Sequence, residues 1–204
     1  MSRDETPWWK NAEWYSDPTA AEALANIKRS QNGALSRING DRFEKIIEDS
    51  IAWYEEKGIV CAEKTPEPMK PLAKPDRKGR FLACFIKKAQ PDFQGTLVGG
   101  RSVVFEAKHT EADRIDYSRL TDEQVKKLKK HHALGAAAFV LVSFGLRDFY
   151  RIPWEVWRDM KAIYGYKHMK QTECEPYRVQ YIAGVLKLFE DIELDYNAKK
   201  GETT

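Results

Sequence analysis

Residues 136–144, AAAFVLVSF, form an almost unbroken apolar run in the second half of the chain. A strand with one face in water alternates apolar and polar residues, whereas a run of this kind is typical of a strand buried on both faces. Gly145 and Leu146 then turn the chain into a second expected strand, residues 147–152. The run therefore predicts a central sheet that other elements cover on both sides.

Helical patterns flank the expected strands. Asn39 is a good N-cap for a helix over residues 39–57, and Gly58 follows its end. Thr121 and Gln124 have the spacing of a capping box and open a helix that runs to about residue 132. Pro153 suits the first position of another helix, and residues 171–193 predict a last helical piece. With a short β run at 59–62 and a hairpin at 91–108, this order predicts an α/β fold with a mixed central β-sheet flanked by helices.

The chain has 204 residues, which suits one domain with appendages. We expect residues 1–35 to be a partly flexible N-terminal arm with at most one helical piece, around residues 19–29, and residues 36–204 to be the domain. No apolar run approaches the ~18 residues of a membrane span, and the N-terminus lacks the apolar core of a secretory signal. Three widely spaced cysteines predict reduced thiols. These features predict a cytoplasmic protein without membrane partners.

Residues 65–90 form a proline-rich insertion that suits neither a central strand nor a helix, and we expect it to project as a stalk. The net charge of the chain is only +3, but residues 64–88 hold eight basic residues against Glu67 and Asp76. This local excess predicts a contact with a polyanion such as DNA. The alternative is a solvated loop that is basic without a partner. The eight candidate DNA-binding residues are Lys64, Lys70, Lys74, Arg77, Lys78, Arg80, Lys87 and Lys88.

The hairpin PDFQGTLVGGRSVVFEAK, residues 91–108, carries Asp92 before its glycine turn and Glu106 and Lys108 after it, where a half-buried hairpin has little use for charge. Glu106 and Lys108 share one face of the second strand because side chains alternate. A two-residue loop would place Asp92 opposite Ala107, on the other face. A three-residue loop, residues 98–100, places Asp92 opposite Glu106. Gly100 supplies the left-handed residue that such a loop needs.

Two opposed carboxylates repel each other unless a cation lies between them. Oxygen ligands with positions left for water and phosphate suit Mg²⁺, with Mn²⁺ as a substitute, and do not suit Zn²⁺. Lys108 would then stabilise negative charge that develops on a phosphate. The alternative is a surface ion pair beside an unrelated aspartate.

Two further residues are candidates for this site. Glu44 lies on the buried side of its expected helix, where an unpaired carboxylate is costly. The alternative is that Glu44 lies at the edge of this face and extends its carboxylate into water. Gln124 serves the capping box, and its amide would also orient water or phosphate if the helix start faces the hairpin. His131 and His132 lack metal-ligand partners at suitable spacing and are structural or contact phosphate.

Several blocks of the sequence resemble the RecU-type Holliday-junction resolvases of the PD-(D/E)xK nuclease superfamily. They are NGDRFEKIIEDSIAWYEEKGIVCAEKTPEP, the hairpin, LTDEQVKKLKKH and GAAAFVLVSF, in this order over about residues 32–155. Asp92, Glu106 and Lys108 match the superfamily signature. The middle of the proline-rich insertion departs from the family in sequence.

The resemblance implies a homodimer that nicks four-way DNA junctions with Mg²⁺, no small-molecule cofactor, and a stalk that enters the junction centre. It implies Asp92, Glu106 and Glu44 as metal ligands, with the Ala107 carbonyl as another. Lys108 would act on the nucleophile or transition state, and Gln124 would be auxiliary. A bacterial cell is the implied setting, with a phage-encoded copy as an alternative source.

Two other functions stay open. One is a PD-(D/E)xK nuclease that acts on other DNA, and the second is a non-catalytic DNA-binding module in recombination. The complete acid set argues against the module, because carboxylates repel phosphate and binding alone does not need them.

Overall fold

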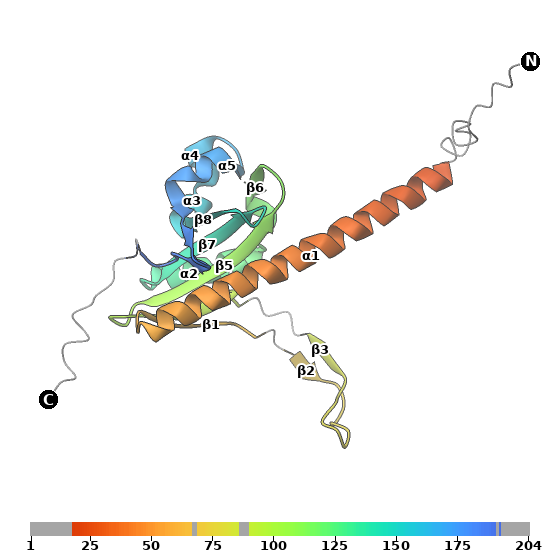
Figure 1. Ribbon diagram of the computed structural model, residues 1–204, viewed down its shortest axis with the longest axis horizontal. Helices are drawn as coiled ribbons and strands as arrows, with labels where there is room; N and C mark the ends of the chain where they lie inside the picture. The colour runs from red at the N-terminus through yellow and green to blue at the C-terminus, as the bar shows by residue number, and fades with distance from the viewer. Residues whose placement is uncertain (1–17, 67–68, 86–89, 191, 193–204) are drawn as a thin grey trace, which may run out of the picture. The chain divides into compact units, whose positions relative to one another are not determined.

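The computed structural model describes residues 18–66, 69–85, 90–190 and 192. The chain divides into two compact units, residues 1–39 and 40–204. Helix α1 (Pro18–Glu56) is continuous across that boundary (Figure 1). The expected helix start at Asn39 is therefore wrong. The alanine-rich stretch before Asn39 favours helix strongly enough to outweigh Gly33 and Gly40, which cost about 1 kcal/mol each.

The expected mixed central sheet is confirmed (Figure 1). Its strand order is β1-β4-β5-β7-β8-β10. Only the β5–β7 pair is parallel, and the other four pairs are antiparallel. The six strands are β1 (Val60–Lys64), β4 (Phe93–Leu97), β5 (Ser102–Thr110), β7 (Ala137–Phe144), β8 (Asp148–Pro153) and β10 (Arg178–Val179).

All eight residues of β7 are buried, as the apolar run predicts. Phe139 and Leu141 belong to the core that also contains Phe43 and Ile47 of α1. The alternate residues of the strand belong to a second core with α2 (Asp122–Ala133), α3 (Trp154–Arg158) and α4 (Met160–Tyr164). The sheet therefore lies between α1 on one face and the later helices on the other.

The expected helix over residues 171–193 is wrong. Only α5 (Gln171–Cys174) and the 3₁₀ turn η4 (Glu175–Tyr177) are helical there, and β10 and the hairpin β11 (Tyr181–Ile182)–β12 (Val185–Leu186) follow. Arg178 explains the change, because its guanidinium binds Asp148 at 2.6 Å and Glu175 at 2.7 Å and so holds β10 against β8. A second small sheet pairs β6 (Arg114–Asp116), which η3 (Tyr117–Arg119) follows, with β9 (His168–Lys170).

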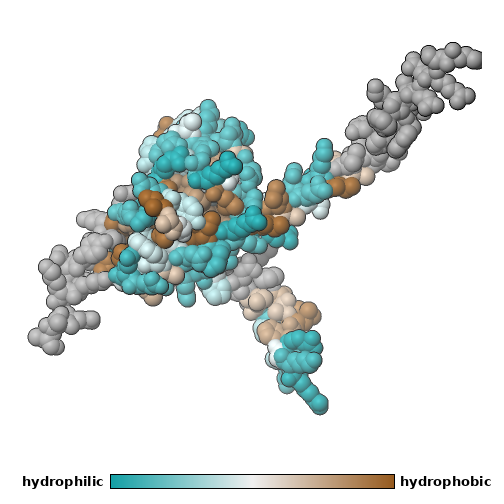
Figure 2. All heavy atoms as spheres, viewed as in Figure 1, coloured by the Kyte–Doolittle hydropathy of each residue, from teal (hydrophilic) through white to brown (hydrophobic). Residues whose placement is uncertain are grey.

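The proline-rich insertion forms a separate two-stranded sheet of β2 (Met69–Pro71) and β3 (Ala83–Phe85). Asp76 organises its tip, because it accepts backbone bonds from Lys78 and Arg80 and forms an ion pair with Arg80 at 3.0 Å. Figure 2 shows this tip as hydrophilic. Lys87 and Lys88 lie outside the described residues. In the described part of the chain, no helix is apolar enough over sufficient length to cross a membrane.

Gly95 allows β1 and β4 to approach closely. A Cβ atom at this position would lie 2.3 Å from the Cys61 carbonyl oxygen and 2.4 Å from the Ala62 Cβ. We expect Gly95→Ala to lower the free energy of unfolding by about 1–3 kcal/mol, measured by urea denaturation. Gly40→Ala is the control, since nothing lies within 4 Å of an added Cβ there. It should raise stability by up to about 1 kcal/mol, and equal effects of the two variants would contradict the close approach.

Candidate active site

The β4–β5 hairpin has the three-residue loop that the sequence predicts. Leu97 and Arg101 close the loop, with the Leu97 amide donating to the Arg101 carbonyl at 2.8 Å. Gly99 and Gly100 both have positive φ, at 89° and 88°. Phe93 pairs with Phe105, and the same register places Asp92 opposite Glu106. The predicted alignment of the two acids is confirmed.

Three stacked phenylalanine rings support this register on the other face of the sheet. Phe93 and Phe105 stack at 4.9 Å between ring centroids, and Phe105 and Phe139 at 4.6 Å. The rings come from β4, β5 and β7 and are almost fully buried. Because side chains alternate, burial of Phe105 turns Glu106 to the opposite face.

Lys108 lies between the two carboxylates. Its ammonium nitrogen is 3.1 Å from Asp92 Oδ2 and 3.1 Å from Glu106 Oε2. The Glu106 side chain is 0% exposed, while 26% of the Asp92 side chain is exposed. Asp92 Oδ2 also accepts the Ala107 amide at 3.0 Å. Asp92, Glu106 and Lys108 therefore form one cluster that opens to solvent on the Asp92 side.

Gln124 completes the predicted capping box and also contacts Glu106 of the hairpin. Its Oε1 accepts the Thr121 amide at 3.0 Å and completes the capping box of α2. Its Nε2 donates to Glu106 Oε2. The cap therefore fixes the amide group that orients Glu106.

Glu106 is an unusual buried acid. Its Oε1 is buried without a hydrogen-bond partner among the described residues. Burial, followed by repulsion from Asp92, raises the pKa of Glu106 to about 8, although Lys108 opposes the shift. A group with a raised pKa and a free oxygen is suited to a cation, because a cation favours the ionised form.

Asp92 and Glu106 fit a hard divalent cation that keeps several waters, as Mg²⁺ does with one or two protein carboxylates. No cluster of three or more Asp, Glu, His or Cys side chains suited to a metal occurs in the described ranges. Glu44 instead binds Lys64 at 2.6 Å. Lys64 pairs with Phe93, so Glu44 lies toward the end of the sheet that carries Asp92. The structure thus brings Asp92, Glu106, Lys108 and Gln124 together and gives Glu44 a different partner.

Thr65 is a site residue that the sequence analysis missed. Its amide donates to the Asp92 carbonyl at 2.9 Å and ties the start of the insertion to the main chain of the candidate metal ligand. The only sequence signal was its position just before Pro66, where an extended backbone is favoured.

The model of the family described as RecU, Recombination protein U, matches residues 38–198. The chain belongs to the RecU family. Two curated relatives are both named Holliday junction resolvase RecU. The one from Streptococcus sanguinis is 24% identical over 67% of this chain and 71% of its own length. The one from Streptococcus gordonii is 24% identical over 63% of this chain and 67% of its own length.

Among solved structures, the RecU-family chain matches Hjc, a Holliday junction resolvase from Archaeoglobus fulgidus, with a TM-score of 0.43 and 14% identity. The match covers 68% of this chain and 93% of that one.

The raised pKa of Glu106 predicts how stability depends on pH without metal. The folded protein keeps Glu106 protonated up to about pH 8, whereas the unfolded chain ionises it near its ordinary pKa of 4.5. The stabilising contribution is therefore complete below the lower pKa and is lost as pH rises through the higher one. In EDTA, we expect the wild type to lose unfolding free energy between about pH 5 and about pH 8 relative to Glu106→Gln, measured by urea denaturation at each pH. Parallel pH profiles would contradict the shift.

Proposed function

We propose that this RecU-family chain cuts four-way DNA junctions by metal-dependent hydrolysis of phosphodiester bonds. By family it is a Holliday junction resolvase, an endonuclease of DNA recombination and repair. The observation that supports the chemistry best is the buried Glu106 carboxylate, with a free Oε1, beside Asp92 and Lys108. A surface that only binds DNA has no use for such a costly pair of acids.

Mg²⁺ is the proposed cation, with Mn²⁺ as a substitute, and Asp92, Glu106 and the Ala107 carbonyl are its proposed ligands. When bound, the ion supplies positive charge that activates water and stabilises the phosphate oxygens. Lys108 is only 14% exposed and already lies between the acids, so its ammonium group is held in place to neutralise charge on the substrate. The Gln124 amide keeps Glu106 oriented toward the cation.

Glu44 is proposed as a further acid of the site. Its ion pair with Lys64 is partly exposed, with 30% and 44% of the two side chains accessible, so Lys64 is free to turn toward a DNA phosphate. Glu44 would then be released toward the cation. This would couple DNA binding to completion of the acid set.

The β2–β3 hairpin is proposed as a stalk that projects from the domain and enters the junction. Lys70, Lys74, Arg77 and Lys78 are exposed on it, and no carboxylate binds their side chains in the contacts that the described residues show. Exposed cations suit phosphate contacts, which are the main source of affinity for DNA. Two strands must be nicked to resolve a junction, and a homodimer with one site per subunit would supply both cuts.

Removing either acid should separate cutting from binding. Asp92→Asn and Glu106→Gln should abolish cleavage of a synthetic four-way junction and leave its binding largely intact, since each loses a metal ligand and no basic contact. Lys108→Ala should cut about 10²-fold more slowly, because it loses preorganised positive charge. Cleavage is measured on denaturing gels with Mg²⁺, and binding by gel shift in EDTA. Glu123→Gln, an exposed acid at the start of α2, is the control and should cut normally; full activity in both acid variants would refute the site.

Neutralising the hairpin should weaken junction binding more than duplex binding. The variant replaces Lys74, Arg77 and Lys78 by alanine at the same time. Arg80 is kept because its ion pair with Asp76 stabilises the tip. Each lost phosphate contact should reduce the salt slope of log K by about 0.9. The measurement is a salt titration of binding to four-way and linear DNA. Equal losses would make the hairpin a general phosphate clamp, and unchanged affinities would exclude it from the interface.

A further inference from the structure

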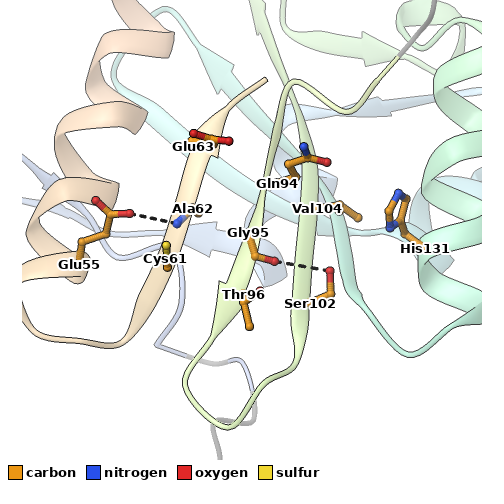
Figure 3. A pocket seen from close by; sticks show the side chains of 10 residues that line it. All are labelled: Glu55, Cys61, Ala62, Glu63, Gln94, Gly95, Thr96, Ser102, Val104 and His131. Atoms are coloured by element: carbon orange, nitrogen blue, oxygen red, sulfur yellow. Dashed lines mark hydrogen bonds between the residues drawn. The ribbon is translucent and has the colours of Figure 1, made fainter. Parts of the chain in front are cut away.

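A polar groove of about 440 Å³ lies on the sheet beside α2 (Figure 3). It is open to solvent and is bounded by β1, β4, β5, α2 and the last turn of α1. The three strands and α2 line it with the polar side chains of Glu63, Gln94, Thr96, Ser102 and His131. None of these residues belongs to the charged cluster of Asp92, Glu106 and Lys108.

The groove continues the active-site face of the sheet. Gln94 lies two residues after Asp92, and Val104 lies two residues before Glu106, so both lie on the face of the acids and about 7 Å from them along the strands. On α2, His131 follows Gln124 by two helical turns and lies on the same side. Gln94 thus follows Asp92 along the chain, Val104 precedes Glu106 on β5, and His131 follows Gln124 on α2. The groove therefore adjoins the active site.

The charges of the groove exclude a phosphate as its occupant. No Lys or Arg is among the ten residues that line it, while Glu55 and Glu63 contribute carboxylates. Glu55 accepts the Ala62 amide at 3.1 Å, which fixes one carboxylate at the rim. The two acids would repel a phosphate and no cationic Lys or Arg side chain offsets them, so the groove favours an occupant that carries hydrogen-bond donors and no negative charge.

The edge of a nucleobase has this chemistry. An amide such as Gln94 pairs with the adjacent donor and acceptor of adenine, and a carboxylate such as Glu63 accepts from the amino group of cytosine. The His131 ring lies at the wall of the groove beside Val104 (Figure 3), where a flat base can stack on it. The volume accommodates one base with its sugar.

We propose that the groove binds one unstacked nucleobase of the cut strand, next to the phosphate that is cleaved. The inference rests on the proposed function, because only a strand held at Asp92 and Glu106 would place its neighbouring base over Gln94. Strands at a junction lack stacking partners on one side at the branch point, which lowers the cost of unstacking. The groove would therefore determine which base the enzyme prefers beside its cut.

The test is a set of four-way junctions that carry each of the four bases at each position flanking the cut. The wild type should cut them at rates that differ by about 5- to 100-fold with the base at one position, which is the discrimination of one good base contact. The Gln94→Ala variant should lose most of this difference in cleavage rate, or spread, and should still cut the junctions that the wild type cuts slowly. Gln180→Ala is the matched control, since Gln180 is exposed outside the groove, and it should retain the full spread.

Each outcome decides one proposal. If the wild type cuts every junction at one rate, or if Gln94→Ala keeps the spread, the base-binding groove is refuted and the resolvase function stands. If the wild type with Mg²⁺ cuts no junction, the proposed function fails and the groove proposal fails with it. Should Gln94→Ala fold poorly, as judged by its melting temperature, Thr96→Val removes another polar group of the groove and keeps the β-branched shape. It should also reduce the spread.

Discussion

The pairing of β4 with β5 is the constraint on which the candidate active site depends. The pairing of Phe93 with Phe105 buries two rings in the core and also places Asp92 opposite Glu106. A slip by one residue would turn the phenylalanines out of the core and the acids into it, so the free energy of burying the rings also enforces the alignment of the acids. The glycine loop and the close approach at Gly95 add local support to the same register.

The same packing creates the electrostatic conflict at the site. Because β5 lies between β4 and β7 and is covered by α2, Glu106 is withdrawn from water on every side. Lys108 and Gln124 satisfy one of its oxygens, and the other has no hydrogen-bond partner within residues 18–66, 69–85, 90–190 and 192. A purely structural position would be filled better by an apolar residue. A buried acid that is incompletely paired is typical of functional sites, where the substrate or a metal supplies the compensating charge.

The elements that local patterns determine could be predicted from the sequence. The apolar run of β7, the capping box of α2 and the three-residue loop each depend on residues close together in the chain. The failures involve longer-range effects. The alanine-rich N-terminal part of α1 favours helix but lacks a sustained apolar period, and Gly33 and Gly40 obscured its continuity with the rest of the helix. Arg178 binds Asp148 and Glu175 and so holds β10 against β8. The periodicity of the sequence does not reveal these ion pairs. The Glu44–Lys64 pair joins residues twenty positions apart and needed the fold to reveal it.

The arrangement of charge suggests how binding and cutting are coupled. The chain is nearly neutral overall, but basic residues concentrate in 64–88 and the carboxylates lie at the sheet. Without a cation, Glu106 is protonated at neutral pH and Lys108 offsets Asp92, so the cluster has no net positive charge to attract a phosphate, whereas the exposed basic residues of the β2–β3 hairpin favour a polyanion. Under the proposed function, DNA would first be captured by the basic hairpin, and a bound divalent ion would add the positive charge that the scissile phosphate needs. Lys108 alone cannot supply this charge, because the Asp92 carboxylate already offsets its ammonium group. On these proposals the hairpin would supply affinity, the cation would permit approach of the scissile phosphate, and the groove beside them would contact a base.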